Sequence, residues 1–270
     1  MAHREFNGSV VAITGAAGGI GQALARACLA AGARVALLDV DAEALAAAAQ
    51  ALTDPVEVVL ARPCDITSET ECGAAMAAIC ERWGGLDLLI NNAGITHRSL
   101  FADTDAAVLR RVMEVNFFGA VNCTRAALPS LVTRRGAIVA LSSVAGFAPL
   151  LGRTGYCASK HAMHGFFDTL RVELAPAGVE VMMVCPSFTD TAMDRVALTG
   201  SGGRTGQARR AVGRQLTPDE VATAIVTGVR RRRRSLVLSP VGKASFWLSR
   251  LLPASYERLM VRSQGAEFGR

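Results

Sequence analysis

The stretch Ser9-Val-Val-Ala-Ile-Thr-Gly-Ala-Ala-Gly-Gly-Ile-Gly21 decides the fold. Its first half is a short β-branched run, which predicts a strand buried on both faces. Its second half carries four glycines and opens an alanine-rich segment that predicts a helix to Ala31. Glycines between a strand and a helix let backbone amides approach a pyrophosphate, which the helix N-terminus then stabilises. The spacing is G-x-x-x-G-x-G, so a turn that merely permits tight helix–strand packing is the alternative.

Short apolar runs recur along the chain, and helical patterns separate them. This alternation predicts a single-domain α/β fold of the Rossmann type, with a doubly wound parallel sheet and helices on both faces. Further strands are predicted at residues 34–39, 56–61, 86–90, 137–141, 179–184 and 236–238. We assign residues 1–242 to this domain, with a mobile lid at 187–216, and residues 243–270 to an amphipathic C-terminal tail.

Asp39 ends the second predicted strand, 18 residues beyond Gly21. An acidic side chain there can accept hydrogen bonds from both ribose hydroxyls of an adenosine half. The alternative is a helix N-cap, for which Asp41 is the better candidate. A 2′-phosphate placed about 4 Å from Asp39 would be repelled by roughly 4 kcal/mol per unit charge. No Arg or Lys at 15–21 or at Val40 offsets that repulsion, so the sequence favours NAD over NADP.

Polar residues follow the third and fourth predicted strands. Asp65 could bond an adenine amino group, although a role in a turn is equally consistent with its position. Ser68-Glu-Thr-Glu71 and Thr217-Pro-Asp-Glu220 have the capping-box pattern and predict helix starts. Asn91-Asn-Ala-Gly94 is a turn-forming set that can border a nucleotide.

Ser143, Tyr156 and Lys160 form the chemical centre of the chain. Tyr156 and Lys160 are four apart in a predicted helix, so their side chains leave the same face one turn apart. A nearby positive charge favours the phenolate form of a tyrosine. Ser143 follows a predicted strand, where open α/β sheets bind ligands. Such a set can hold a hydroxyl or carbonyl oxygen and transfer its proton. Asn116, inside a predicted helix over 105–131, is either a packing residue or the holder of a relay water.

Composition excludes several classes of protein. The chain has 270 residues, of which 51% are apolar and 19% charged, as in ordinary globular domains. Seven scattered cysteines without C-x-x-C favour reduced thiols in the cytoplasm over disulfides. The histidines form no metal-ligand pattern, and Arg98 is expected to be a solvated loop arginine. The net charge of +6 is modest and lies late in the chain, and no nucleic-acid partner is expected.

The motifs together resemble the short-chain dehydrogenase/reductase family. They are T-G-A-A-G-G-I-G at 14–21, N-N-A-G at 91–94, Asn116, Ser143 and Y-C-A-S-K at 156–160. The resemblance implies an oxidoreductase in which Tyr156 is the acid/base and Lys160 lowers its pKa and holds the nicotinamide ribose. Ser143, rather than Ser142, would bind the substrate oxygen because the family places its serine thirteen residues before the tyrosine, and Asn116 would extend a proton relay.

The resemblance also implies cofactor contacts for Asp65 and for Thr191, which would meet the carboxamide. Ser187 departs from the family, which most often has glycine after the proline. The complete set of residues expected to bind NAD is Gly15, Gly19, Ile20, Gly21, Asp39, Asp65, Ile66, Asn92, Ala93, Gly94, Tyr156, Lys160, Pro186 and Thr191.

Finer details resemble one branch of the family, the dehydrogenase/reductase 7-like and 11β-hydroxysteroid dehydrogenase-like enzymes. The branch implies a lipophilic secondary alcohol or its ketone as substrate, such as a steroid, a retinoid or an acyl lipid. A homodimer or homotetramer is expected. Two alternatives are a 3-oxoacyl reductase of lipid metabolism, which would be expected to prefer NADP, and a dinucleotide-sensing protein that has lost catalysis.

The C-terminal tail carries an apolar stripe with basic flanks. Phe246, Trp247, Leu251, Leu259 and their neighbours alternate with Lys243, Arg250 and Arg258, after five arginines at 230–234. The stripe is expected to pack on the domain or on a partner subunit. The alternative is peripheral contact with a membrane, in which the apolar groups enter the interface and the arginines meet anionic lipid.

Overall fold

The computed structural model describes residues 3–52, 57–191, 193, 195–206 and 214–269. Residue 56, where the third strand was predicted to begin, lies outside the described residues. So do parts of the predicted lid (192, 194 and 207–213) and the chain ends at 1–2 and 270.

Within these residues, seven parallel strands form one sheet in the order β3-β2-β1-β4-β5-β6-β7. The order reverses beside β1, which lies between β2 and β4, and such a switch point opens a crevice at the carboxyl ends of the strands. The predicted doubly wound α/β fold is confirmed. The strands are β1 (Val10–Thr14), β2 (Arg34–Asp39), β3 (Val59–Pro63), β4 (Leu88–Asn91), β5 (Ala137–Leu141), β6 (Glu180–Cys185) and β7 (Ser235–Val237).

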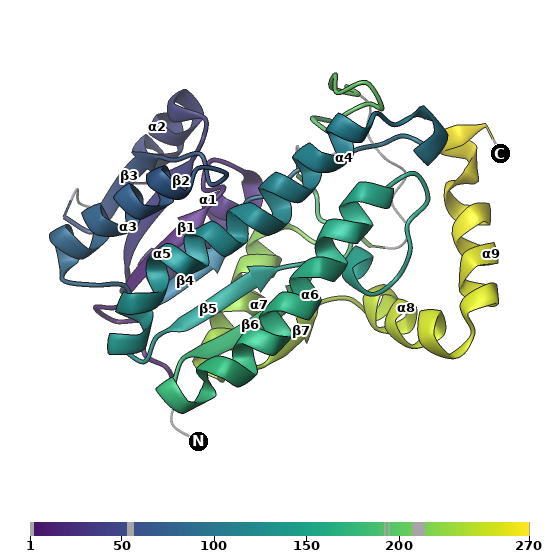
Figure 1. The fold of residues 1–270 in the computed structure, drawn as a ribbon. Helices are drawn as coiled ribbons and strands as arrows, with labels where there is room; N and C mark the ends of the chain where they lie inside the picture. The colour runs from purple at the N-terminus through teal and green to yellow at the C-terminus, as the bar shows by residue number, and fades with distance from the viewer. Residues whose placement is uncertain (1–2, 53–56, 192, 194, 207–213, 270) are drawn as a thin grey trace.

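The central strands are buried on both faces of the sheet, and their side chains alternate between two cores. In β1, Val10 and Ala12 pack in one core and Val11 and Ile13 in the other. The first core is covered by α3 (Glu69–Trp83), α5 (Gly119–Thr133) and α6 (Thr154–Leu174), which cross the front of the sheet in Figure 1. The second core is covered by α1 (Gly19–Ala30), α2 (Ala42–Gln50) and α7 (Pro218–Arg230).

The two predicted capping boxes differ in outcome. At the start of α7, Glu220 N–H donates to Thr217 Oγ1 at 3.2 Å and Thr217 N–H donates to the Glu220 carboxylate at 2.9 Å. At α3 only half of the box forms. Ser68 Oγ accepts from Glu71 N–H at 3.2 Å, but the Glu71 carboxylate accepts from Asp65 N–H at 2.9 Å, which holds the preceding turn instead.

The helix predicted over 105–131 is interrupted. It consists of α4 (Ala106–Met113), a π-helical turn at Glu114–Phe118, and α5. Asn116 lies in the π turn and is fully buried. A π turn inside a longer helix often marks a functional site.

The C-terminal tail forms two helices, α8 (Pro240–Leu251) and α9 (Pro253–Gln264), followed by a short 3₁₀ turn at Gly265–Phe268. Helix α8 spans the predicted boundary between residues 242 and 243. In Figure 1 the two helices, drawn in yellow, stand at the right-hand edge of the molecule. Tyr256 of α9 is buried, and its hydroxyl donates to the Pro149 carbonyl at 3.3 Å. The inner side of the tail therefore packs on the domain.

Candidate active site

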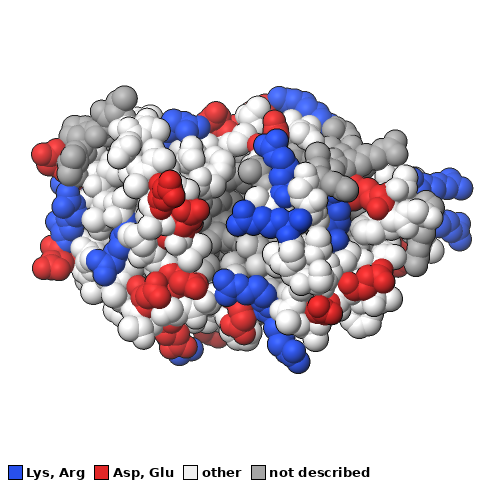
Figure 2. All heavy atoms as spheres, turned by 90° about the horizontal axis from the view of Figure 1, so that it is seen from above, with Lys and Arg blue, Asp and Glu red and all other residues white. Residues whose placement is uncertain are grey.

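A cavity of about 900 Å³ lies at the carboxyl ends of the central strands. Figure 2 shows a groove across this side of the molecule, with acidic side chains over the left half, where α2 and α3 lie, and basic side chains beside the groove. Every residue predicted to bind the cofactor lines the cavity, as do Ser143, Tyr156 and Lys160. Asn116 is absent from the lining.

The glycine turn after β1 requires glycine at two positions. Gly15 has a φ of 65°, and a Cβ there would come within 2.7 Å of Ala93 Cα. A Cβ on Gly21 would come within 2.2 Å of the Gly15 carbonyl oxygen. Asn92 follows β4, the neighbour of β1 in the sheet, and it fixes the turn. Its Nδ2 donates to the carbonyls of Thr14 at 2.8 Å and Gly15 at 3.0 Å. The glycine turn after β1 and the Asn91-Asn-Ala-Gly94 segment after β4 thus form one rigid unit.

The Asp39 carboxylate is held at the edge of this turn. One oxygen accepts from Ala17 N–H at 2.9 Å, and the other accepts from Asp41 N–H at 3.2 Å. Asp41 itself caps α2 by accepting from Ala44 N–H at 3.0 Å, so the helix-cap role falls to Asp41 as predicted. Two backbone donors fix Asp39 in place while it still lines the cavity.

Asp65 has the turn role that the sequence allowed. Its Oδ1 accepts from the backbone N–H of Thr67 at 2.9 Å and from the Thr67 hydroxyl at 2.8 Å. Burial acts to raise the pKa of Asp65, but these hydrogen bonds and the charge of Arg111 lower it below its usual value. The carboxylate is therefore ionised at neutral pH, beside the buried Ile66 and at the wall of the cavity.

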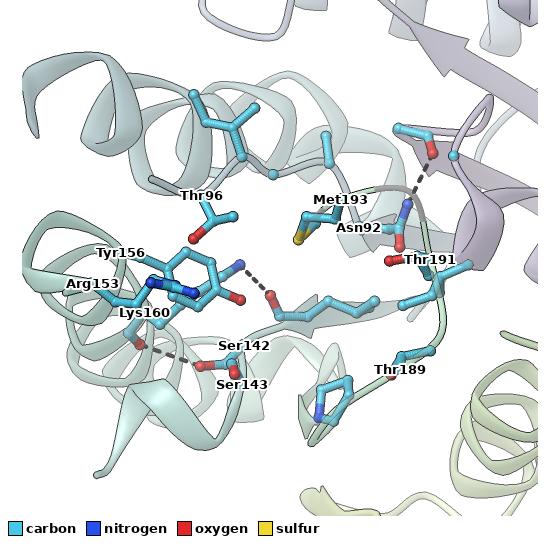
Figure 3. A pocket seen from close by; sticks show the side chains of 18 of the residues that line it. Asn92, Thr96, Ser142, Ser143, Arg153, Tyr156, Lys160, Thr189, Thr191 and Met193 are labelled. Atoms are coloured by element: carbon cyan, nitrogen blue, oxygen red, sulfur yellow. Dashed lines mark hydrogen bonds between the residues drawn. The ribbon is translucent and has the colours of Figure 1, made fainter. Parts of the chain in front are cut away.

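Tyr156 and Lys160 both come from α6, one turn apart (Figure 3). The Lys160 ammonium donates to the Leu141 carbonyl at 2.7 Å, which ties it to the end of β5. It lies 5.8 Å from the centre of the Tyr156 ring. Lys160 is 4% exposed, and burial lowers its pKa to about 8 because desolvation disfavours the charged form. A lysine of that pKa still carries its charge through most of the neutral range.

The two serines after β5 differ in how their hydroxyls are used. Ser142 Oγ donates to the Lys160 carbonyl at 3.3 Å, as Figure 3 shows, so its proton is already engaged. Ser143 Oγ accepts from Ala145 N–H at 3.2 Å, which leaves its own hydrogen available toward the cavity among the described contacts. Of the two serines, Ser143 is the one able to donate to a substrate oxygen.

Asn116 stands behind the wall of the cavity. Its Oδ1 accepts from Ile95 N–H at 2.7 Å, and its Nδ2 donates to the Ile95 carbonyl at 2.9 Å and to Ser159 Oγ at 2.9 Å. Ser159 Oγ in turn donates to the Tyr156 carbonyl at 2.8 Å. Both amide hydrogens are thus engaged in joining the segment after β4 to α6. A relay water could use only the remaining lone pair of Oδ1.

The loop after β6 forms the wall of the cavity beside Ser143. The Pro186 carbonyl accepts from Val144 N–H at 3.1 Å, next to Ser143. The Thr191 methyl carbon would lie 3.4 Å from a Cβ on Gly19, so this loop reaches the glycine turn. Ser187, the position that departs from the family, lines the cavity, and its hydroxyl makes no hydrogen bond within the described residues.

The family model described as short chain dehydrogenase matches residues 9–200. The chain belongs to the short-chain dehydrogenase family. It is 36% identical over 264 residues to the dehydrogenase/reductase SDR family protein 7-like of Anopheles gambiae, covering 95% of this chain and 83% of that protein. The predicted resemblance to the dehydrogenase/reductase 7-like branch is confirmed, and this short-chain dehydrogenase is an oxidoreductase.

Two solved structures of the family resemble this chain in fold. A short-chain dehydrogenase/reductase from Burkholderia phymatum in complex with NAD has a TM-score of 0.82 and 28% identity, covering 92% of this chain and 94% of its own. A short-chain dehydrogenase from Burkholderia cenocepacia in complex with NADP has a TM-score of 0.80 and 25% identity, covering 96% of this chain and 99% of its own. Related structures therefore hold either dinucleotide.

The sequence did not show that the tail of this short-chain dehydrogenase forms part of the cavity wall. The lining from the tail is mainly apolar and comprises Val241, Ala244, Ser245, Leu248, Tyr256, Leu259, Met260, Ser263 and Gln264. The amphipathic stripe was the available signal, but a stripe alone does not tell which surface it covers.

Charged side chains with little exposure to solvent join the end of the tail to the wall of the cavity. Glu267 lies 3.7 Å from an Arg153 guanidinium nitrogen and 4.0 Å from Arg98 Nε. Arg153 precedes α6 and lines the cavity. The expectation of a solvated Arg98 is wrong, because its side chain is only 8% exposed.

His97, also buried, accepts from Gly155 N–H through Nε2 at 2.9 Å, so it supports the first turn of α6. Burial, reinforced by the charge of Arg153, lowers the pKa of His97 to about 4, which keeps it neutral and able to accept.

Two wider properties hold for the part of the chain that the structure describes. No group of three or more His, Cys, Asp and Glu side chains there could hold a metal ion. No helix in the same residues has both the length and the apolar character needed to cross a membrane.

Proposed function

We propose that this protein uses NAD(H) to interconvert a lipophilic secondary alcohol and its ketone. One observation carries the proposal. Ser143, Tyr156 and Lys160 line the same cavity as the glycine turn and Asp39, and the rest of that cavity is largely apolar. A proton-transfer group, a dinucleotide-binding turn and an apolar substrate space thus share one site.

The residues at the glycine turn fit a dinucleotide. Gly18 and Gly19 line the cavity at the N-terminus of α1, where backbone amides stabilise phosphate. Asp39 would accept from the adenosine ribose, and Lys160 would donate to the nicotinamide ribose. When bound, NAD supplies the hydride acceptor and NADH the hydride donor.

The proton is handled by Tyr156. In alcohol oxidation its phenolate oxygen would take the hydroxyl proton, and in ketone reduction its hydroxyl would return one. The charge of Lys160, held in place by the Leu141 carbonyl, favours that phenolate. Ser143 would donate to the same substrate oxygen and hold it against Tyr156. Asn116 would act by positioning, because its amide joins Ile95 to Ser159 on the catalytic helix.

Asp39 supports NAD over NADP. Its carboxylate is fixed by two backbone N–H groups and cannot turn away from a 2′-phosphate without giving up both. The proposal of a lipophilic substrate is supported by the apolar side chains of Leu150, Leu248 and Met260, which line the same cavity as Tyr156.

A screen of dinucleotide-linked turnover tests the proposal. Purified full-length protein would be assayed for NADH formation with sterols, retinol and medium-chain secondary alcohols, each also with NADP. We expect turnover with NAD on at least one lipophilic alcohol. Reduction of a 3-oxoacyl thioester with NADPH alone would favour a 3-oxoacyl reductase. Tight NAD binding with no turnover on any substrate in either direction would favour a sensing protein.

A further inference from the structure

The two tail helices expose an unusually large number of apolar side chains. Of the twelve large hydrophobic residues exposed within the described part of the chain, six lie between Val241 and Val261. A concentration of exposed apolar side chains in one region of a surface often marks an interaction site. We call this surface the tail face, and its members are Val241, Trp247, Leu251, Leu252, Leu259 and Val261.

The members of the tail face that do not line the cavity, namely Trp247, Leu251, Leu252 and Val261, are 48% to 70% exposed. The inner side of α8 carries Phe246, whose ring packs edge-on against Phe147 with centroids 5.1 Å apart. The inner side of α9 carries the buried Tyr256. Trp247 and Leu251, by contrast, are 61% and 70% exposed. The apolar stripe of the sequence therefore divides into side chains that pack on the domain and side chains that are exposed to solvent.

Charge indicates what covers the tail face. Helices α8 and α9 carry Lys243, Arg250, Arg258 and Arg262 against the single acidic residue Glu257. All four basic residues are exposed, and none forms an ion pair within the described residues. Exposed Trp and Leu flanked by Lys and Arg without acidic partners match the interface of an anionic membrane, in which apolar groups enter the acyl boundary and cations meet headgroups.

The tail face also reaches the mouth of the cavity. Val241 and Leu259 line the cavity and yet are 37% and 54% exposed, so they stand at its rim. Val196, in the segment between β6 and α7, also lines the cavity and is 45% exposed. The tail face and the wall of the cavity therefore share Val241 and Leu259.

We propose that the tail face docks this protein on an anionic lipid surface, with the mouth of the cavity turned toward the lipid. Docking follows from the tail face and its charges alone. Entry of a lipophilic substrate from the bilayer rests in addition on the proposed function. The two claims are tested by different readouts.

Docking can be tested by flotation of the full-length protein with phosphatidylcholine vesicles that contain about 30% phosphatidylserine. This assay measures lipid binding and does not depend on turnover. Trp247→Ser/Leu251→Ser removes two apolar groups that do not line the cavity. Arg258→Glu/Arg262→Glu reverses two charges. The matched control, Val132→Ser/Val172→Ser, removes two exposed apolar groups from α5 and α6.

We expect the wild type and the control to float at low salt. The apolar variant should lose at least about tenfold in partitioning. The charge variant should lose at least about 30-fold, since each basic group near an anionic surface contributes about fivefold and the two added carboxylates are repelled in addition. Vesicles of phosphatidylcholine alone should bind the wild type weakly.

Three results would overturn docking. The first is absence of wild-type flotation at low salt, and the second is an equal loss of flotation in the control and the apolar variant. The third is a wild type that self-associates but does not bind lipid, together with an apolar variant that no longer self-associates. That result would assign the tail face to a second copy of the chain. Failure of NAD-linked turnover with intact flotation would count against the proposed function only.

Discussion

Replacing Asp39 by Asn should change the choice of cofactor. The substitution keeps the shape of the side chain and one oxygen acceptor while removing the negative charge. In the structure that charge is fixed by hydrogen bonds from Ala17 N–H at 2.9 Å and Asp41 N–H at 3.2 Å. A 2′-phosphate bound about 4 Å away would be disfavoured by about 4 kcal/mol per unit charge at intermediate dielectric, or about a thousandfold.

Two opposite shifts in affinity are therefore expected for Asp39→Asn. NADP should bind about 100-fold more tightly than to the wild type, because most of the repulsion has gone. NAD should bind about tenfold more weakly, because a charge-assisted hydrogen bond to ribose has become a neutral one. Isothermal titration of both dinucleotides into the wild type and the variant measures both shifts.

Glu43→Gln is the matched control, since Glu43 is an exposed carboxylate in the first turn of α2 that does not line the cavity. It should leave both affinities within about twofold, because exposed charges are largely screened. Tighter wild-type binding of NADP than of NAD would refute the reasoning. An unchanged ratio of the two affinities in Asp39→Asn would do the same.

Two further predictions concern buried charges. The pKa of Lys160 is lowered by burial from 10.5 to about 8, so between these values the unfolded chain binds a proton that the folded chain does not. The free energy of unfolding should therefore rise with pH across this window by about 3 kcal/mol relative to Lys160→Met, as measured by urea unfolding. Parallel pH profiles would contradict it. Glu267→Gln should lower the free energy of unfolding by about 3 kcal/mol, because it removes the carboxylate beside buried Arg98 and Arg153. The exposed Glu257→Gln is the control, and equal effects of the two substitutions would exclude a special role for Glu267.

The central strands could be predicted well because both of their faces are buried. The strands predicted at 34–39 and 137–141 have the observed bounds, since every residue from Ala137 to Leu141 is buried and the apolar run has clear ends. The edge strand was predicted at 56–61, but β3 spans Val59–Pro63. It pairs only with β2 and is half exposed, so its hydrophobic pattern is weak, and an edge strand tolerates the proline that ends it.

The interior of the site was less accessible to sequence reasoning. Nothing in Glu114-Val-Asn-Phe-Phe118 signals a π turn, because no glycine or proline interrupts the helical pattern. The engagement of Asn116 with Ile95 and Ser159 depends on segments 21 and 43 residues away in the chain. The pairing of Glu267 with Arg98 and Arg153 could not be predicted for the same reason, because it joins segments that are far apart in the chain. Periodicity shows that a helix has an apolar side, whereas tertiary packing determines what that side meets.

The most direct test of the proposed chemistry is the Tyr156→Phe variant, assayed for NAD affinity and for turnover of the best alcohol in the screen. The variant loses only the phenolic oxygen that transfers the proton. NAD affinity should stay within about threefold of the wild type, because the glycine turn, Asp39 and Lys160 remain. Turnover should fall by at least about 100-fold, the usual contribution of a general acid–base group. Retention of more than about 5% of the wild-type rate, with NAD still bound, would show that Tyr156 is not the proton-transfer group.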